Sequence, residues 1–271
     1  MRLRQIALAA TDLEAAVDAL TDVLGIEVAY ADPEVGVFGL VNAMMPIGET
    51  HLEVVSPVRD DAAVKRWIAR RGGDAGYMVI LQCEGEDRLA AAVERAKAAK
   101  ASVVWEGRHE GAHGVHFHPR ELGAVLSFDA MPRYDDWIWA GPDWRHHVRT
   151  ATVTAITGVE IGAPDPEQLA ARWGEVFGLP PRATRRDGGP VIELPGGGRI
   201  VFVPSDGLGE GPDDVSADVP DDESGGASAG VVGVELAVAD RAGFERRARA
   251  RGVLAADGVA ILAGTRFVPR D

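Results

Sequence analysis

The sequence contains a single cysteine, so no disulfide can form within the chain. That residue, Cys83, stands in the apolar run MVILQC, where a buried and inert thiol is a more frequent arrangement than a nucleophile. Long apolar segments are also missing, since no run approaches the ~18 to 20 residues that a membrane span requires. The N-terminal stretch MRLRQIALAATDL has too short an apolar part for a signal peptide. We therefore expect a cytoplasmic protein without membrane contacts.

Positive charge is scarce in this chain. Lys and Arg number 28 against 42 Asp and Glu, which gives a formal net charge of −14, and no basic patch stands out. Nucleic acid is therefore not an expected partner. Hydrophobic residues make up 46% of the 271 residues, so the chain can bury real cores and is long enough for one large domain or two ordinary ones.

One pattern occurs four times: a short apolar strand, an acidic residue, an amphipathic helix, a glycine and further short strands. In the first copy, QIALAATDLEAAVDALTDVLGIEV, Thr11 and Glu14 read as a capping box and the helix ends at Gly25. In the third copy, GVEIGAPDPEQLAARWGEVFGL, Asp165 caps the helix and Pro166 takes its first position. The second and fourth copies, YMVILQCEGEDRLAAAVERAKAAKASVVW and GVELAVADRAGFERRARARGV, are weaker.

The spacing of these copies predicts two paired halves. Gln5 and Tyr77 anchor the first pair, and Gly158 and Gly233 anchor the second pair at nearly the same separation. We predict an α+β fold of four β-α-β-β-β units, with one domain in residues 1–130 and another in residues 154–271.

Two segments stand outside the repeats. Residues 131–153 contain Trp137, Trp139 and Trp144 and are expected to clasp the two halves together, with a ligand-stacking platform as the alternative. Residues 206–230 carry eight carboxylates and no Lys or Arg, which predicts a flexible acidic surface loop in the second domain.

The repeat, the strand THLEVVSP and the block HFHPRELGAVLSFD resemble the vicinal oxygen chelate superfamily, which includes glyoxalase I, methylmalonyl-CoA epimerase, extradiol dioxygenases and bleomycin-resistance proteins. The resemblance is clearer for residues 1–130 than for residues 154–271. It implies two tandem glyoxalase-like domains, each an open, cup-shaped mixed sheet with outer helices around a small-molecule site.

The resemblance also implies where a divalent metal such as Fe, Mn, Zn or Ni would sit, on one side chain from each of four strands. The matching positions in the first domain are Gln5, Glu53, Tyr77 and Ser127, of which only Glu53 is a strong ligand. In the second domain the first-strand positions are glycines. The resemblance therefore implies that the inherited metal site is dismantled.

The strand THLEVVSP leaves two alternatives open, because His51 and Glu53 lie two residues apart and so face the same side of a sheet. A metal site could be rebuilt from Glu53, His51, His116 and His118, unless His118 belongs to a His-Pro turn. Without a metal, burial in an apolar cup would raise the pKa of Glu53 and suit it to act as a general base.

Further carboxylates stand at matching places in the second half. Glu160 and Glu235 each lie two residues after a glycine anchor. They are expected either to act together in the second cup or to face solvent from their strands.

Two functions fit these residues. The first is an enzyme, a lyase, isomerase or dioxygenase acting on a small organic molecule, with Glu53 and Tyr77 catalytic and with Gln5, His51 and Ser127 as ligand contacts. The second is a metal-free protein that sequesters or senses a drug-like compound, as bleomycin-resistance proteins do. A scaffold with both cups filled by side chains is a third. The expected partner is a small-molecule ligand, and a homodimer is compatible with the sequence.

Overall fold

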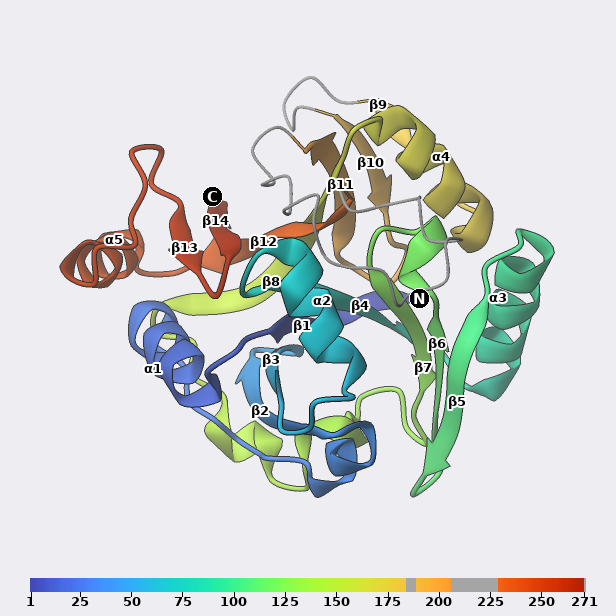
Figure 1. The fold of residues 1–271 in the computed structure, drawn as a ribbon, viewed down its shortest axis with the longest axis horizontal. Helices are drawn as coiled ribbons and strands as arrows, with labels where there is room; N and C mark the ends of the chain where they lie inside the picture. The colour runs from blue at the N-terminus through green and yellow to red at the C-terminus, as the bar shows by residue number, and fades with distance from the viewer. Residues whose placement is uncertain (184–188, 206–228, 271) are drawn as a thin grey trace.

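The computed structural model describes residues 1–183, 189–205 and 229–270, and in this part of the chain the strands form two seven-stranded sheets (Figure 1). Across the first sheet the order is β2 (Leu40–Ile47), β3 (Thr50–Pro57), β1 (Arg2–Ala9), β4 (Ala75–Cys83), β7 (Val125–Ala130), β6 (Ala112–Phe117) and β5 (Val103–His109). Across the second it is β13 (Ala260–Leu262), β14 (Thr265–Arg270), β12 (Gly230–Val238), β8 (Val153–Ala163), β11 (Arg199–Pro204), β10 (Pro190–Glu193) and β9 (Arg182–Ala183).

Helices pack on both faces of the first sheet, because Val64 and Trp67 cluster with Ala9 and Val55 on the cup face while Leu20 and Leu89 enter the main hydrophobic core. The helices are α1 (Leu13–Leu24), α2 (Ala63–Arg71), α3 (Glu86–Ala98), α4 (Pro166–Phe177) and α5 (Arg241–Ala250), with short 3₁₀ turns η1 (Pro33–Phe38), η2 (Pro119–Glu121), η3 (Ile138–Ala140) and η4 (Trp144–His147). The expected α+β fold, with two cup-shaped mixed sheets and outer helices, is confirmed (Figure 1). No helix within the described ranges is long and apolar enough to cross a membrane.

Each sheet is built around an antiparallel pair of strands from its two repeat units. In the first sheet this pair is β1 and β4, and the parallel partners β3 and β7 flank it. β8 and β12 form the corresponding pair in the second sheet. The second and third units have three strands after their helix, as predicted. In the described residues of the first and fourth units, the first of these strands is reduced to an isolated bridge, Tyr30 with Met44 and Leu254 with Ala260.

Local signals account for the helix ends, with one exception. Asp165 caps α4 through the backbone N–H of Gln168, and the glycines that follow α1 and α4 adopt the left-handed conformation, as predicted. The predicted Thr11 cap of α1 is wrong, because the Asp12 side chain accepts the N–H of Ala15 and the helix begins one residue later. A carboxylate is the stronger acceptor for the exposed N–H groups of a first turn.

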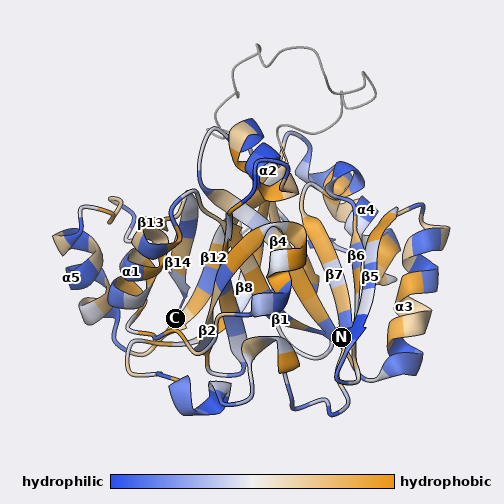
Figure 2. Cartoon of the chain, turned by 60° about the horizontal axis from the view of Figure 1, so that its bottom comes forward, coloured by the Kyte–Doolittle hydropathy of each residue, from blue (hydrophilic) through white to orange (hydrophobic). Residues whose placement is uncertain are grey.

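The two sheets share one hydrophobic core. Alternate residues of the central strands, such as Ile6 and Val79, enter the same apolar cluster as Val159 and Val234 of the second sheet. Figure 2 shows hydrophobic residues concentrated on the strands and hydrophilic ones on the outer surfaces of the helices. The other set of alternate residues faces the cups, so the periodicity of each strand separates core residues from site residues.

The tryptophans of residues 131–153 pack into the first half. Trp137 and Trp144 are fully buried in a cluster with Met44, Met78 and other residues of the first cup. Thr152, near the end of the segment, accepts a hydrogen bond from Arg247 of the second half, so the clasp stays a prediction. The shared core also joins the two halves. Of the predicted acidic loop, residues 206–230, residues 206–228 lie outside the described residues, and Gly230 begins β12.

The second cup is occupied by an ionic cluster. Glu160 and Glu235 are both buried and face the cup, which decides against the solvent-facing alternative. Arg199 donates to both oxygens of Glu235 at 2.7 and 3.0 Å, and Arg270 bonds both carboxylates. Arg266 donates to Glu160 at 3.2 Å. Buried carboxylates need such partners, so this cluster has a structural explanation.

The glycine anchors of the second half make room for these carboxylates. A Cβ on Gly158 would lie 2.3 Å from Oε2 of Glu235 and 3.1 Å from the backbone oxygen of Arg199. A Cβ on Gly233 would lie 2.4 Å from Oε2 of Glu160. Each glycine therefore pairs with the glutamate that stands opposite it on the neighbouring strand.

We expect Gly158→Ala to lower the free energy of unfolding by about 2 kcal/mol, because the methyl group displaces a carboxylate that two arginines hold in place. Urea unfolding of the purified protein measures the change. Gly36→Ala is the matched control, since no atom lies within 4 Å of its added Cβ, and it should leave stability nearly unchanged. Equal effects of the two substitutions would contradict the proposed packing.

Candidate functional site

The first cup contains a cavity of about 470 Å³. Its walls are mostly apolar, with side chains from β1, β2, β3 and β4 and from η1. The polar side chains that reach it are Gln5, Asp32, Glu34, Asn42, Glu53, Tyr77, Trp105, His116, Asp129 and Trp139. An apolar cavity with a few convergent polar groups is typical of a small-molecule site.

Glu53 lies on the wall of this cavity and is held by two amides. β3 pairs with β1 in parallel register, which brings Glu53 opposite Ala7 on the cup face. Gln5 Nε2 donates to Oε2 of Glu53 at 2.8 Å, and Asn42 Nδ2 donates to Oε1 at 2.7 Å. Each carboxylate oxygen thus receives one hydrogen bond and keeps a free lone pair.

The orientation of both amides is fixed by donor groups behind them. The indole N–H of Trp137 donates to Oε1 of Gln5 at 2.7 Å, and the backbone N–H of Asp32 donates to Oδ1 of Asn42 at 2.8 Å. Neither donor can accept a hydrogen bond, so each amide must turn its oxygen to that donor and its NH₂ group to Glu53.

Burial raises the pKa of Glu53 to about 7, from an ordinary value of 4.5. The hydrogen bonds from Asn42 and Gln5 favour the ionised form and oppose this effect, but loss of solvent dominates. A carboxyl group that titrates near neutrality can both accept and donate a proton at pH 7, which is the property expected of a general base.

A second buried carboxylate, Asp129, which was not among the predicted site residues, lines the same cavity. It accepts hydrogen bonds from Ser127 Oγ at 2.5 Å and from Trp139 Nε1 at 2.7 Å. Burial raises its pKa to about 6. The alternation in VLSFDA could have indicated it, because Asp129 follows Ser127 by two residues and so shares its face.

Ser127 therefore supports Asp129 and does not line the cavity. Its hydroxyl is fully buried and its proton is engaged with the carboxylate. Its predicted role as a ligand contact stays a prediction that the geometry does not favour.

Tyr77 lines the cavity, but it is not the counterpart of Gln5. The register pairs Gln5 with Ile80 and Ala7 with Met78, so the pseudo-twofold axis of the β1–β4 pair relates Gln5 to Met78. A register shift beside Ala7 leaves Tyr77 as the extra residue of β4. Burial raises the pKa of Tyr77 to about 12, which keeps its hydroxyl protonated and able to donate.

The four residues predicted as a rebuilt metal site are not brought together. His51 is fully buried against Trp144, 4.7 Å between ring centroids, and burial with the nearby Arg4 charge holds its pKa well below the ordinary value. His118 Nδ1 accepts the backbone N–H of Arg120 in a His-Pro turn. His116 does line the cavity, and burial lowers its pKa to about 4.

The inherited metal position does not fit a hard divalent cation either. Its four places hold Gln5, Glu53, Met78 and Ser127, and Gln5 turns its NH₂ group to Glu53. An NH₂ group and a thioether are poor ligands for such an ion. In the described ranges no three His, Cys, Asp or Glu side chains form a group that could hold a metal.

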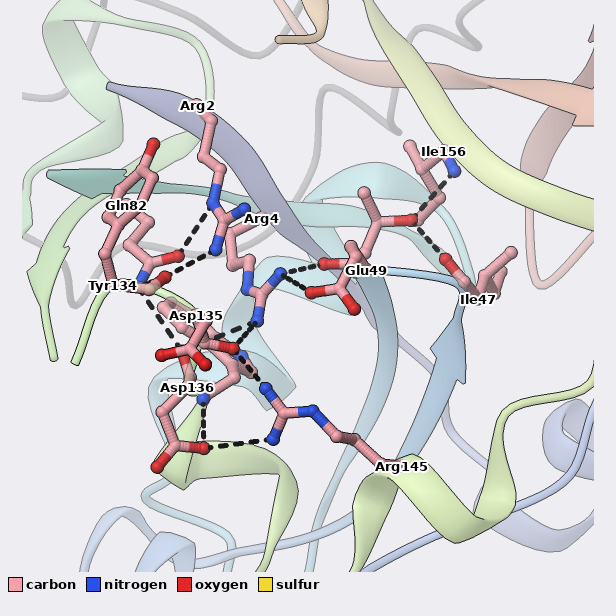
Figure 3. A network of polar contacts seen from close by, with 12 residues as sticks. Arg2, Arg4, Ile47, Glu49, Gln82, Tyr134, Asp135, Asp136, Arg145 and Ile156 are labelled. Atoms are coloured by element: carbon pink, nitrogen blue, oxygen red, sulfur yellow. Dashed lines mark hydrogen bonds and ion pairs between the residues drawn. The ribbon is translucent and has the colours of Figure 1, made fainter. Parts of the chain in front are cut away.

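Segment 134–136 of the linker is held down by buried polar side chains (Figure 3). Arg2 and Gln82 bond the carbonyl oxygen of Tyr134 at 2.6 and 3.0 Å. Arg4, whose guanidinium is buried beneath Trp137 and Trp144, reaches the carbonyls of residues 135 and 136 and the carboxylate of Glu49. These contacts fix the start of the linker over the floor of the first cup.

A second cavity of about 430 Å³ adjoins the first. The two cavities share Phe38, Tyr77, Trp105 and His116 among their lining residues. The second is lined by four arginines: Arg66, Arg70, Arg71 and Arg120. These arginines have contacts within the protein: the Arg71 guanidinium, for example, donates to the backbone oxygen of Ala229 and lies over the ring of Trp67.

Known proteins resemble this chain, and the matching family model covers most of its first half. A family model described as the Glyoxalase/Bleomycin resistance protein/Dioxygenase superfamily matches residues 2–126. Mitochondrial methylmalonyl-CoA epimerase of Mus musculus is 28% identical over 128 residues, 46% of this chain and 70% of that protein. Ethylmalonyl-CoA/methylmalonyl-CoA epimerase of Cereibacter sphaeroides is 30% identical over 129 residues, 46% of this chain and 93% of that protein.

One solved structure resembles both halves. A mutant of 4-hydroxymandelate synthase from Streptomyces coelicolor superposes with a TM-score of 0.66 over 93% of this chain and 75% of that chain, at 19% identity. This likeness supports the arrangement of the two sheets.

We expect a measurable pH dependence of stability from Glu53. Because its folded-state pKa of about 7 lies above 4.5, its ionisation destabilises the folded protein as the pH rises through this interval. Relative to Glu53→Gln, the free energy of unfolding of the wild type should fall by about 3 kcal/mol between pH 4.5 and 8. Urea unfolding at several pH values measures this difference. Glu94→Gln, at an exposed position of α3, is the control, and a wild-type curve parallel to that of Glu53→Gln would contradict the burial effect.

Proposed function

The chain belongs to the vicinal oxygen chelate superfamily of glyoxalases, bleomycin-resistance proteins and dioxygenases, and on this premise we propose that its first cup catalyses proton transfer on a small organic molecule. The reaction class is an isomerisation or epimerisation at a carbon next to a carbonyl group. The observation that carries this proposal is the pair of buried carboxylates, Glu53 and Asp129, in one apolar cavity with pKa values of about 7 and 6.

Glu53 would act as the base. Each of its oxygens has one amide donor, so a remaining lone pair can take the proton from the substrate carbon. The electron pair of the broken C–H bond would move onto the carbonyl oxygen and form an enolate. The apolar walls would exclude water and strengthen the interactions within the site.

Asp129 and Tyr77 would complete the transfer. β3 and β7 stand on opposite sides of the β1–β4 pair, so Asp129 can return a proton to the carbon from a side other than that of Glu53. The protonated hydroxyl of Tyr77 would donate a hydrogen bond to the enolate oxygen. With these roles assigned to Glu53, Asp129 and Tyr77, the reaction needs no metal ion at the inherited metal position.

The names of the relatives support a substrate class. The curated relatives are named as epimerases of methylmalonyl-CoA and ethylmalonyl-CoA. The acyl group of such a thioester would lie beside Glu53 in the first cavity. Acyl-CoA thioesters are therefore the first compounds to test. A dioxygenase is less well supported, because the donor set around Glu53 suits no iron.

A metal-free binding protein of the drug-sequestering type is the second candidate. The apolar lining of the 470 Å³ cavity and the loss of three of the four inherited ligand positions favour it. In that case ligand would bind without chemical change, and Glu53 and Asn42 would serve to hold a polar group of the ligand.

The enzymatic proposal predicts incorporation of deuterium from D₂O into the α-carbon of methylmalonyl-CoA or a related thioester, followed by ¹H NMR. Glu53→Gln and Asp129→Asn should each lower the rate by about 10²-fold or more. A chelator should leave the rate unchanged. His146→Gln, at an exposed position of the linker, is the control and should retain the rate. Exchange that survives Glu53→Gln would overturn the assignment, and saturable binding without exchange would favour the second candidate.

A further inference from the structure

We propose that Trp137 is a positioning residue of the first cup, which orients the Gln5 amide towards Glu53 and so makes the linker part of the site. This inference rests on the proposed function for its catalytic meaning, but its structural content is independent of any substrate. It goes beyond the superfamily resemblance, because Trp137 belongs to the segment between the repeats and lies outside residues 2–126, which the family model matches.

The indole of Trp137 is fully buried. Its N–H reaches Oε1 of Gln5 at 2.7 Å, and Gln5 is itself only 2% exposed. A buried amide oxygen without a donor would be unfavourable, so the indole selects one of the two flips of this amide. The selected flip places the NH₂ group 2.8 Å from Glu53. In the other flip, two oxygen atoms would face each other.

The second carboxylate receives the same kind of support. Trp139, two residues further along the linker, donates its indole N–H directly to Asp129 at 2.7 Å. Both acid–base groups of the cup therefore depend on indole donors from one short segment. The repeats alone supply the carboxylates but not these donors.

The anchoring of the linker makes this arrangement specific. Arg2, Arg4 and Gln82 bond the backbone of residues 134–136, just before Trp137 (Figure 3). A tether of this kind limits where the indoles can lie, and a positioned group must be held by its surroundings.

Other groups around the cavity act on Glu53 as well. The titratable side chains that line the cavity with it are Asp32, Glu34, Tyr77, His116 and Asp129. In the described residues none of them forms a hydrogen bond with the Gln5 amide, which bonds Glu53 and Trp137, so changes at Trp137 and Gln5 test the proposed relay.

The test is hydrogen exchange of the Gln5 side-chain NH₂ group in the full-length protein, measured by ¹H–¹⁵N NMR and assigned by its absence in Gln5→Leu. Trp137→Phe should accelerate this exchange about tenfold or more, because the amide loses its fixed flip. Trp144→Phe is the matched control: Trp144 is equally buried, and its indole N–H has no hydrogen-bond partner in the described residues. It should change the exchange about twofold at most.

A second variant keeps the proposal testable if Trp137→Phe does not fold. Gln5→Leu removes the acceptor of the Trp137 indole, so one of the six tryptophan indole N–H signals should shift clearly. Where exchange of substrate protons is observed, Trp137→Phe should lower kcat/KM about tenfold and add nothing in the Gln5→Leu background.

The outcomes separate this inference from the proposed function. Equal amide exchange in Trp137→Phe and Trp144→Phe, or unmoved indole signals in Gln5→Leu, would overturn the positioning role whatever the activity. Accelerated exchange confined to Trp137→Phe would support it even if no substrate were turned over.

Discussion

The architecture of the first cup depends on keeping a carboxylate buried without a counter-ion beside it. Among the described residues, Glu53 receives hydrogen bonds only from the neutral amides of Gln5 and Asn42, and these are less favourable to the ionised form than a cation would be. Three neighbouring segments provide the hydrogen bonds that hold Glu53. β1 supplies Gln5, β2 supplies Asn42, and the linker supplies the indole that orients Gln5. A cation at the same place would lower the pKa of Glu53 and remove its suitability as a base near neutrality.

The two cups stabilise their buried carboxylates in different ways, although the two sheets share the same arrangement of central strands. In the second cup, glycines replace the first-strand side chains, and the space so gained is filled by Glu160 and Glu235 with their arginine partners. These carboxylates are neutralised and largely sealed by ion pairs. In the first cup, Glu53 faces an open cavity. The same topology therefore carries an ionic cluster in one half and a candidate binding site in the other.

Part of the first-cup site could be predicted from the sequence. Each residue that was not predicted correctly has a specific physical reason. The alternation of THLEVVSP placed Glu53 on the cup face, because a strand can divide its residues in only one way. Asp129 was not predicted, because the family pattern indicates Ser127, two residues earlier, as the site position on this strand. Tyr77 was assigned to the wrong equivalent position because a β-bulge adds one residue to β4, and no sequence pattern locates a bulge reliably.

By itself, the sequence determined the repeat, the α+β fold and the inward direction of Glu53, since these follow from periodicity and helix caps that act over a few residues. Only the tertiary structure decided which groups meet Glu53. The linker tryptophans come from more than 80 residues further along the chain, and their return into the first cup depends on Arg4 and its neighbours. Hydrogen bonds between such distant residues depend on the path of the backbone through space, which local patterns do not specify.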